Sequence, residues 1–171
     1  MHYPDCDSQS YFFNDGFPNI PWTNGALDLI GGTDSEIGSG KSNTDLIIDA
    51  LGSGENYAAS HARAYVNIDY GVGVFNDWYL PSINELMAMK NAFLDVATKN
   101  ESLLKENEYS WHDWENFLNA CFKNKTNIWS STEHDESHAF TMNIRQGVDV
   151  EPVALHKSMV VIMAIIPIRA F

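Results

Sequence analysis

The stretch Asn127-Ile128-Trp129-Ser130-Ser131-Thr132-Glu133 decides the fold class, because the spacing of apolar residues changes where it begins. Before it, apolar residues recur every three or four positions, as on one face of a helix. From here on they alternate, which predicts strands over 127–131, 139–144, 148–153 and 159–170, with a hairpin turn at Gln146-Gly147. Helices early and antiparallel strands late in the chain predict an α+β domain.

The clearest helix start is Pro81-Ser82-Ile83-Asn84-Glu85, where Ser82 and Glu85 have the spacing of a capping box. A second helix is expected over 43–51, with N-cap residues at 42–45 and Gly52 as its stop. Helical spacing also predicts a helix over 56–66. A further helix is expected from about Ser110, with an apolar stripe formed by Trp114, Phe117, Leu118, Cys121 and Phe122.

The first 40 residues are rich in turn formers, and within them only 26–30 is predicted to be a short strand. Their aromatic residues are too apolar for a free tail: Tyr11, Phe12, Phe13, Phe17 and Trp22. We therefore expect one domain over 1–171, in which 1–30 is an N-terminal extension packed on the body.

The formal net charge of -13 argues against nucleic acid as a partner, because such binding depends on Lys and Arg. The acidity either keeps the protein soluble or attracts a cationic partner. No run of residues is apolar enough to span a bilayer, so we expect no membrane insertion. The start of the chain lacks the pattern of a signal peptide, which leaves a cytosolic, phage-borne or trimmed exported protein open.

The motifs that could carry chemistry are weak, and we expect no catalytic residue, no metal and no cofactor. Gly38-Ser39-Gly40-Lys41-Ser42 resembles a phosphate-binding loop but has Ser35 where that loop needs its first glycine. His134 and His138, with acidic neighbours, are compatible with a weak metal site or with a solvated loop. Cys6 and Cys121 are too few for a metal cluster, and a disulfide between them is left open.

Three ordered stretches resemble a known family: 38–48, 76–86 (Asn-Asp-Trp-Tyr-Leu-Pro-Ser-Ile-Asn-Glu-Leu) and 128–133 (Ile-Trp-Ser-Ser-Thr-Glu). Together with the ending 166–171 they resemble the domain of unknown function 1566, also called the C-terminal domain of the collagen-like adhesins. This resemblance implies a C-type-lectin-like fold related to formylglycine-generating enzymes, with roles in adhesion and in binding glycans or proteins. Some relatives of this fold are hypervariable binding proteins of bacteria and their phages.

We therefore expect a non-catalytic binding domain on a cell surface, secreted or on a phage particle, with a glycan or protein as ligand and a homo-oligomer left open. The residues expected to be structural are Asp77, Trp78, Tyr79, Ser82, Glu85, Trp129 and Arg169. Glu133 is assigned both to the buried polar contacts and to the ligand face. The residues expected to contact ligand are Glu133, His134, Asp135, Glu136, His138, Asn143, Arg145, Gln146, Asp149, Glu151, His156 and Lys157. Two alternatives are a structural component of a phage particle or fibre, and an oxidase-like enzyme that uses both cysteines.

Overall fold

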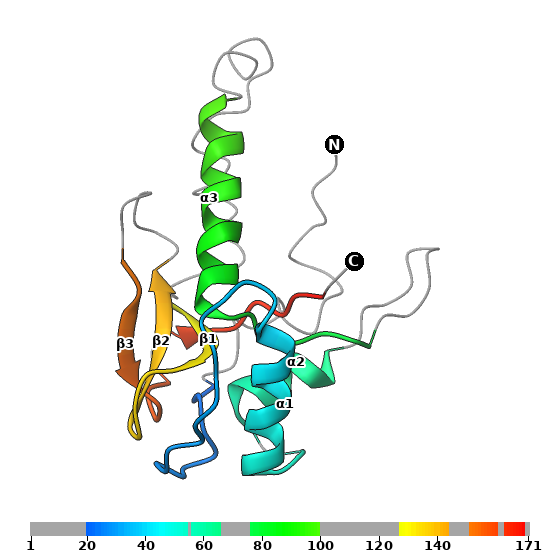
Figure 1. The fold of residues 1–171 in the computed structure, drawn as a ribbon, viewed down its shortest axis with the longest axis vertical. Helices are drawn as coiled ribbons and strands as arrows, with labels where there is room; N and C mark the ends of the chain where they lie inside the picture. The colour runs from blue at the N-terminus through cyan, green and yellow to red at the C-terminus, as the bar shows by residue number, and fades with distance from the viewer. Residues whose placement is uncertain are drawn as a thin grey trace.

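The computed structural model of the chain describes residues 20–54, 56–65, 76–99, 127–143, 151–160 and 163–169. The helices of this part are α1 (Gly40–Leu51), α2 (Ala58–Ala64) and α3 (Ile83–Lys99). The strands are β1 (Asn127–Glu133), β2 (His138–Asn143), β3 (Val153–His156) and β4 (Met163–Ala164). Helices precede strands along the chain (Figure 1), so the predicted α+β class is confirmed.

The strands form one sheet in the order β3-β2-β1-β4. β2 pairs antiparallel with both β1 and β3, so that His138 lies opposite His156. β4 pairs parallel with β1, with Asn127 opposite Met163, which corrects the expectation of a wholly antiparallel sheet. The reason is topological: the chain leaves β3 and re-enters the sheet on the far side of β1, running in the same direction as β1.

Three predicted strands need correction. β3 begins at Val153, where the predicted strand 148–153 ends, and Glu151 and Pro152 lie outside it. Of the described residues in the segment 159–170, which are 159–160 and 163–169, only 163–164 are in a strand, and beyond them Ile168 makes an isolated antiparallel bridge to Tyr79. The segment 26–30 is a loop, because the N–H groups of Ile30 and Gly31 donate to the carboxylate of Glu133 rather than to a neighbouring strand. The helix from about Ser110 and the turn at 146–147 lie outside the described residues.

Helix α3 begins at the predicted capping box. The N–H of Ser82 donates to Oε2 of Glu85 over 2.7 Å, and the N–H of Glu85 donates to Oγ of Ser82 over 3.2 Å. The free oxygen of Glu85, Oε1, accepts a bond from the N–H of Gly38, which ties the loop before α1 to the start of α3. One short motif therefore starts a helix and fixes a second segment.

Helix α1 begins at Gly40, three residues earlier than predicted, and ends as predicted at Gly52, whose φ of 88° favours glycine. A Cβ on Gly40 would lie 2.2 Å from Oε2 of Glu85 and 2.8 Å from the backbone nitrogen of Ser82. The Gly-Ser-Gly-Lys-Ser motif therefore supplies a close approach between α1 and the start of α3.

The core lies between β1 and helices α1 and α2, and Trp22 and Trp129 are its largest buried side chains. The indole N–H of Trp22 donates to the carbonyl of Ser130 over 2.8 Å, and that of Trp129 donates to the carbonyl of Ile20 over 3.0 Å. The two tryptophans thus hold the N-terminal segment and β1 together from both sides. Within the described part of the predicted N-terminal extension, Ile20 and Trp22 are buried in this core.

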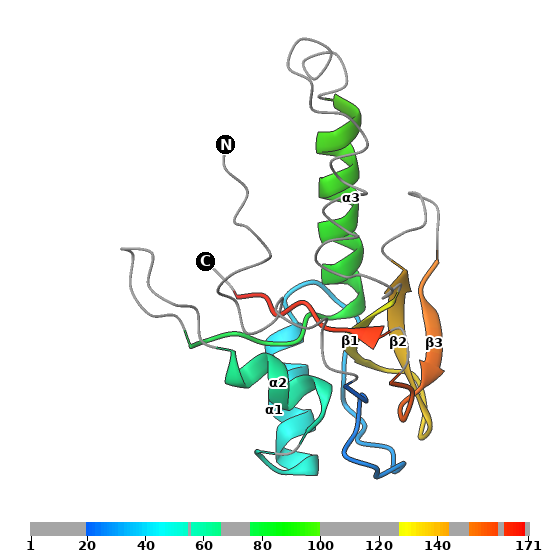
Figure 2. The ribbon, with the colours of Figure 1, turned by 180° about the vertical axis from the view of Figure 1, so that it is seen from behind.

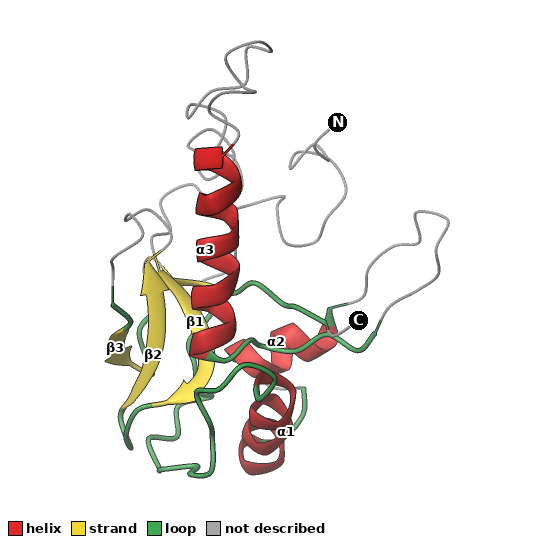
Figure 3. Ribbon diagram, turned by 45° about the horizontal axis from the view of Figure 1, so that its top comes forward, coloured by secondary structure: helices red, strands yellow, loops and turns green. Residues whose placement is uncertain are grey.

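Helix α3 packs against β1 and β2 and extends away from the sheet, whereas α1 packs against β1 with α2 beside it (Figures 1 and 3). The described helices include none long and apolar enough to cross a membrane. At the end of the sheet opposite to α3, the β1–β2 turn, the end of β3 and the loop around residues 24–30 lie side by side (Figures 1 and 2). We call this region the loop end.

Candidate ligand-binding surface

The loop end is organised around the ammonium group of Lys157, which follows β3 and is fully buried. Its Nζ lies 2.5 Å from Oε1 of Glu133 and donates to the carbonyl of Glu136 over 2.9 Å. It also reaches the carbonyl of Asp28 at 3.4 Å and lies 4.9 Å from the centre of the Trp22 ring. One cation therefore connects the turn after β3, the β1–β2 turn and the loop 24–30.

Glu133 completes this anchor from the end of β1. Its Oε1 accepts the N–H of Ile30 over 3.0 Å, and its Oε2 accepts the N–H of Gly31 over 2.8 Å. The side chain of Lys157 is 1% exposed and that of Glu133 is 3% exposed. A buried ion pair whose remaining donors and acceptors are satisfied gives the loops a fixed base.

The prediction that Glu133 and Lys157 contact ligand is therefore corrected, because both are enclosed by the loops that they join. The other interpretation of Glu133, as a buried polar contact, agrees with its geometry. Burying two charged groups costs free energy because both lose their water. Here the two opposite charges and the backbone hydrogen bonds around them replace that water and offset the cost.

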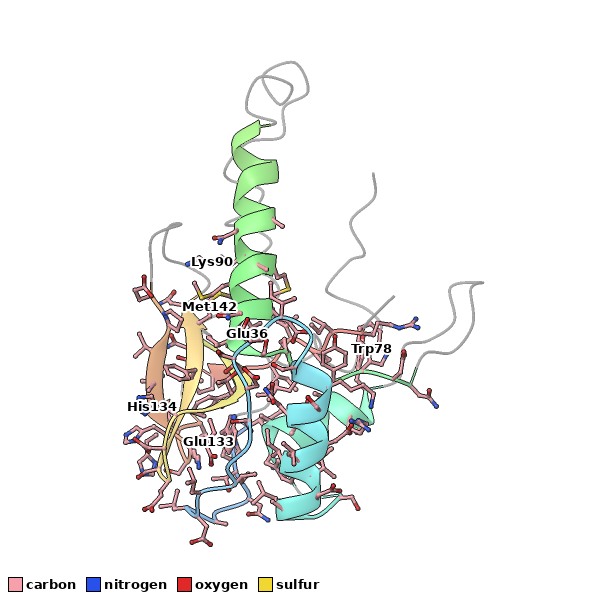
Figure 4. All side chains as sticks on the ribbon, in the orientation of Figure 1. Glu36, Trp78, Lys90, Glu133, His134 and Met142 are labelled. Carbon is pink, nitrogen blue, oxygen red and sulfur yellow. The ribbon has the colours of Figure 1, made fainter. Side chains whose placement is uncertain are left out.

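The side chains around this anchor point outward. In the β1–β2 turn, His134, Asp135 and His138 each keep 40% or more of their side-chain surface exposed, and Glu136 is also exposed. In the loop 24–30, Leu27 and Leu29 are exposed. The loop end therefore presents accessible apolar, acidic and imidazole groups on loops that a rigid scaffold holds in place, which is where binding residues are often found. Figure 4 shows His134 and Glu133 together at this end.

Asp135 sets the shape of the β1–β2 turn. Its Oδ1 accepts the N–H groups of Ser137 and His138, each over 2.8 Å, and lies 2.9 Å from Nδ1 of His138. The imidazole of His134 also contacts its Oδ2 at 3.1 Å. The bond from His138, together with the backbone bond from Ser137, lowers the pKa of this carboxyl well below its usual value. The turn is thus built on an ionised aspartate.

Histidine rings continue across the sheet from this turn. The ring of His138 lies edge-on to the rings of His134 and His156, with centroid distances of 6.4 and 5.7 Å. The Nδ1 atom of His156 lies 2.7 Å from Oγ of Ser158 and accepts the Ser158 N–H over 3.3 Å. Within the described residues, no set of three or more His, Cys, Asp or Glu side chains is arranged to hold a metal ion.

A shallow hollow of about 300 Å³ adjoins the turn after β3. Its lining carries no ionisable side chain and consists of Pro21, Thr23, Asn24, Gly25, Asn56, Ser158 and Val160. Hydroxyl and amide groups at the rim suit an uncharged polar group better than a strongly charged one.

The predicted ligand residues are divided between the two ends of the sheet. His134, Asp135, Glu136, His138 and His156 come together at the loop end. Asn143 ends β2 and Glu151 precedes β3, which places both at the opposite end. Arg145, Gln146 and Asp149 lie outside the described residues.

The residues expected to be structural occupy junctions of the fold. Ser82 and Glu85 form the cap of α3, and Trp129 and Tyr79 are buried. Arg169 pairs with Asp77, with 3.0 Å between Nε and Oδ1, at a partly exposed position rather than in the core. Trp78 packs edge-on against Tyr65, with centroids 4.8 Å apart.

Sequence reasoning missed the contribution of the loop 24–30 to this surface. The apolar residues within 26–30 favour a strand, namely Leu27, Leu29 and Ile30. The signal for a loop is the pair of turn formers on either side, Asn24-Gly25 and Gly31-Gly32. The amide of Asn24 holds this loop by donating to the carbonyl of Leu51 over 3.0 Å.

Lys90 on α3 is a buried ionisable group that lies outside this arrangement (Figure 4). It is 8% exposed, its Nζ has no hydrogen-bond partner among the described residues, and burial lowers its pKa. In Figure 4 it lies toward the α3 end of the sheet, away from Glu133 and His134, so it does not belong to the loop end. Cys6 and Cys121, on which the enzyme alternative depends, lie outside the described residues.

Comparison with known proteins leaves the family of this chain open. No family model, curated protein or solved structure matches it.

Proposed function

We propose that this protein is a non-catalytic binding domain of C-type-lectin-like fold that recognises a glycan or protein through its loop end. The observation that carries the proposal is the convergence of three loops on the buried ammonium group of Lys157. A binding module needs loops that keep their shape before the ligand arrives, because ordering them on binding reduces affinity. The Glu133–Lys157 pair supplies such preorganisation.

Two further features support this function. The ordered motifs at 38–48, 76–86 and 128–133 resemble the collagen-like adhesin domain, whose relatives act in attachment. The serines of the third motif also have structural partners: Oγ of Ser130 donates to the carbonyl of Phe140, and Oγ of Ser131 accepts from the side-chain amide of Asn43. We therefore propose display on a cell, or on a phage or other particle, where such a domain meets its ligand.

The direct test is to screen the full chain, as a labelled protein, on glycan and surface-protein arrays. We expect a restricted set of ligands, with binding reduced about tenfold or more by Leu29→Ser, since central apolar contacts of an interface usually contribute most to affinity. Ile37→Ser is the matched control, because Ile37 is 69% exposed against 57% for Leu29 but lies in the loop 33–39 before α1.

Equal losses in the two variants would move the binding surface away from the loop end. Absence of any ligand on both arrays, together with turnover of a small-molecule substrate, would contradict the proposed function itself.

A further inference from the structure

Two leucine side chains stand out from the loop end on a single short stretch. Leu27 is 44% exposed and Leu29 is 57% exposed, so each presents a large part of its side chain to solvent. The backbone just after them is held by the buried carboxylate of Glu133. A partner can therefore bury both leucines without the cost of ordering the loop that carries them.

Acidic residues border this pair of leucines. The carbonyls of Asp28 and Glu136 both lie within reach of Nζ of Lys157, at 3.4 and 2.9 Å, so the two residues are neighbours although they belong to different loops. Both are exposed, and Asp135 beside Glu136 is partly exposed. The exposed leucines and an acidic rim thus form one continuous surface.

The acidic rim has no accessible Lys or Arg beside it in the part of the loop end that the structure describes. Lys157 is buried there and is already paired with Glu133. The other described Lys and Arg side chains belong to α1, α2, α3 and the segment after β4. The surface that would complement this rim is therefore positively charged.

The apolar part of the surface favours a protein over a glycan. A sugar carries hydroxyl groups on most of its carbons, and burying them against leucine without a hydrogen bond costs free energy. An apolar side chain of a protein gains free energy from the same contact. Sulfated or phosphorylated glycans would in addition be repelled by the carboxylates.

We propose that the partner of the loop end is a basic segment of another protein. An apolar side chain of this segment packs on Leu27 and Leu29, and a neighbouring Lys or Arg pairs with Asp28 or Glu136. The leucines supply most of the affinity, whereas the carboxylates orient the partner and speed its encounter. This inference rests on the proposed binding function and names the class of its ligand.

The test is a peptide array probed with the labelled full chain at pH 7.5, next to the glycan array. Three sets of peptides share one length: basic peptides with Lys and Leu, the same peptides with Ser in place of Leu, and the same peptides with Glu in place of Lys. We expect binding to the first set alone. It should weaken about threefold or more between about 50 and 300 mM NaCl, because salt screens exposed charges.

The double reversal Asp28→Lys/Glu136→Lys should weaken binding to the first set about tenfold or more, because it places like charges against each other. The milder Asp28→Asn/Glu136→Gln keeps the shape of both side chains and should show a smaller loss in the same direction. Glu36→Lys/Asp49→Lys is the matched control, since it changes the net charge of the chain equally at exposed positions before and on α1. This control should weaken binding by less than about twofold.

Equal losses in the two double reversals would overturn the inference, because the peptides would then respond to the acidity of the whole chain. Binding to the glycan array with no peptide bound would also overturn it, while the binding function would stand. Absence of binding on every array would contradict the proposed function, and this inference with it.

Discussion

The ammonium group of Lys157 and the carboxylate of Glu133 lie 2.5 Å apart in the interior, although 24 residues separate them along the chain. Their pairing is what allows the three loops of the loop end to share one anchor. The stability of this region therefore depends on both charges together rather than on either one alone.

Lys157→Met is expected to destabilise the protein by about 3–5 kcal/mol, because it leaves the Glu133 carboxylate buried without its cation. Urea unfolding at pH 7 measures this loss. The double variant Glu133→Gln/Lys157→Met should recover part of it, since it removes the unpaired charge and the glutamine oxygen still accepts one of the two backbone N–H groups of Ile30 and Gly31. Lys41→Met serves as the control, because its ion pair with Asp45 is exposed and should contribute only about 0–1 kcal/mol. Equal losses for Lys157→Met and Lys41→Met would contradict a buried anchor.

Gly40→Ala is expected to destabilise the fold by about 1–3 kcal/mol, although alanine favours helices more than glycine does. The added Cβ would meet Glu85 and the backbone of Ser82, both of which belong to the cap of α3. Thermal unfolding measures the change. Ser42→Ala, an exposed position of the same helix, should change stability by less than about 0.5 kcal/mol. If Gly40→Ala left the unfolding temperature unchanged, α1 and the start of α3 would not be in close contact at this position.

Asp135 gives stability a defined dependence on pH. Its pKa is lowered in the folded state, so its contribution is complete well above the ordinary value of 3.8 and is lost as the pH falls from there towards the folded value. Asp135→Asn should therefore reduce the loss of stability between pH 5 and pH 2, measured by urea unfolding at a series of pH values. Asp49→Asn, at an exposed position of α1, is the matched control. An unchanged acid dependence in Asp135→Asn would show that the turn does not need the ionised carboxylate.

Trp22→Phe should weaken the attachment of the N-terminal segment by about 1–3 kcal/mol, because the carbonyl of Ser130 loses its buried donor. The mirror change, Trp129→Phe, removes the donor to the carbonyl of Ile20 and should have a similar effect. Amide hydrogen exchange of residues 20–30 should rise in both variants. If exchange there stays at its original rate, the segment is held by apolar packing rather than by the indole bonds.

Features of the fold that depend on neighbouring residues were predictable from the sequence. The Ser82–Glu85 box starts α3, and Gly52 ends α1, because each acts through atoms within one helical turn. The alternation after Lys125 likewise located β1 and β2 to within two residues. The α+β class follows from these elements.

The candidate surface was less predictable, because its residues meet across long sequence distances. Nothing near Lys157 indicates that its side chain turns inward, since its acceptors come from Asp28, Glu133 and Glu136. For the same reason, the attachment of the loop 24–30 could not be predicted, because the N–H groups of Ile30 and Gly31 donate to a carboxylate about 100 residues away.

The reciprocal tryptophan bonds impose an order of events on biosynthesis. Trp22 leaves the ribosome long before its acceptor, since Ser130 follows it by 108 positions. At translation rates of about 5–20 residues per second, an aromatic segment waits roughly 5–20 s for β1 to emerge. During that interval the Trp22 side chain of the nascent chain cannot be buried against β1. Chaperones therefore have time to bind before the N-terminal segment packs on the sheet.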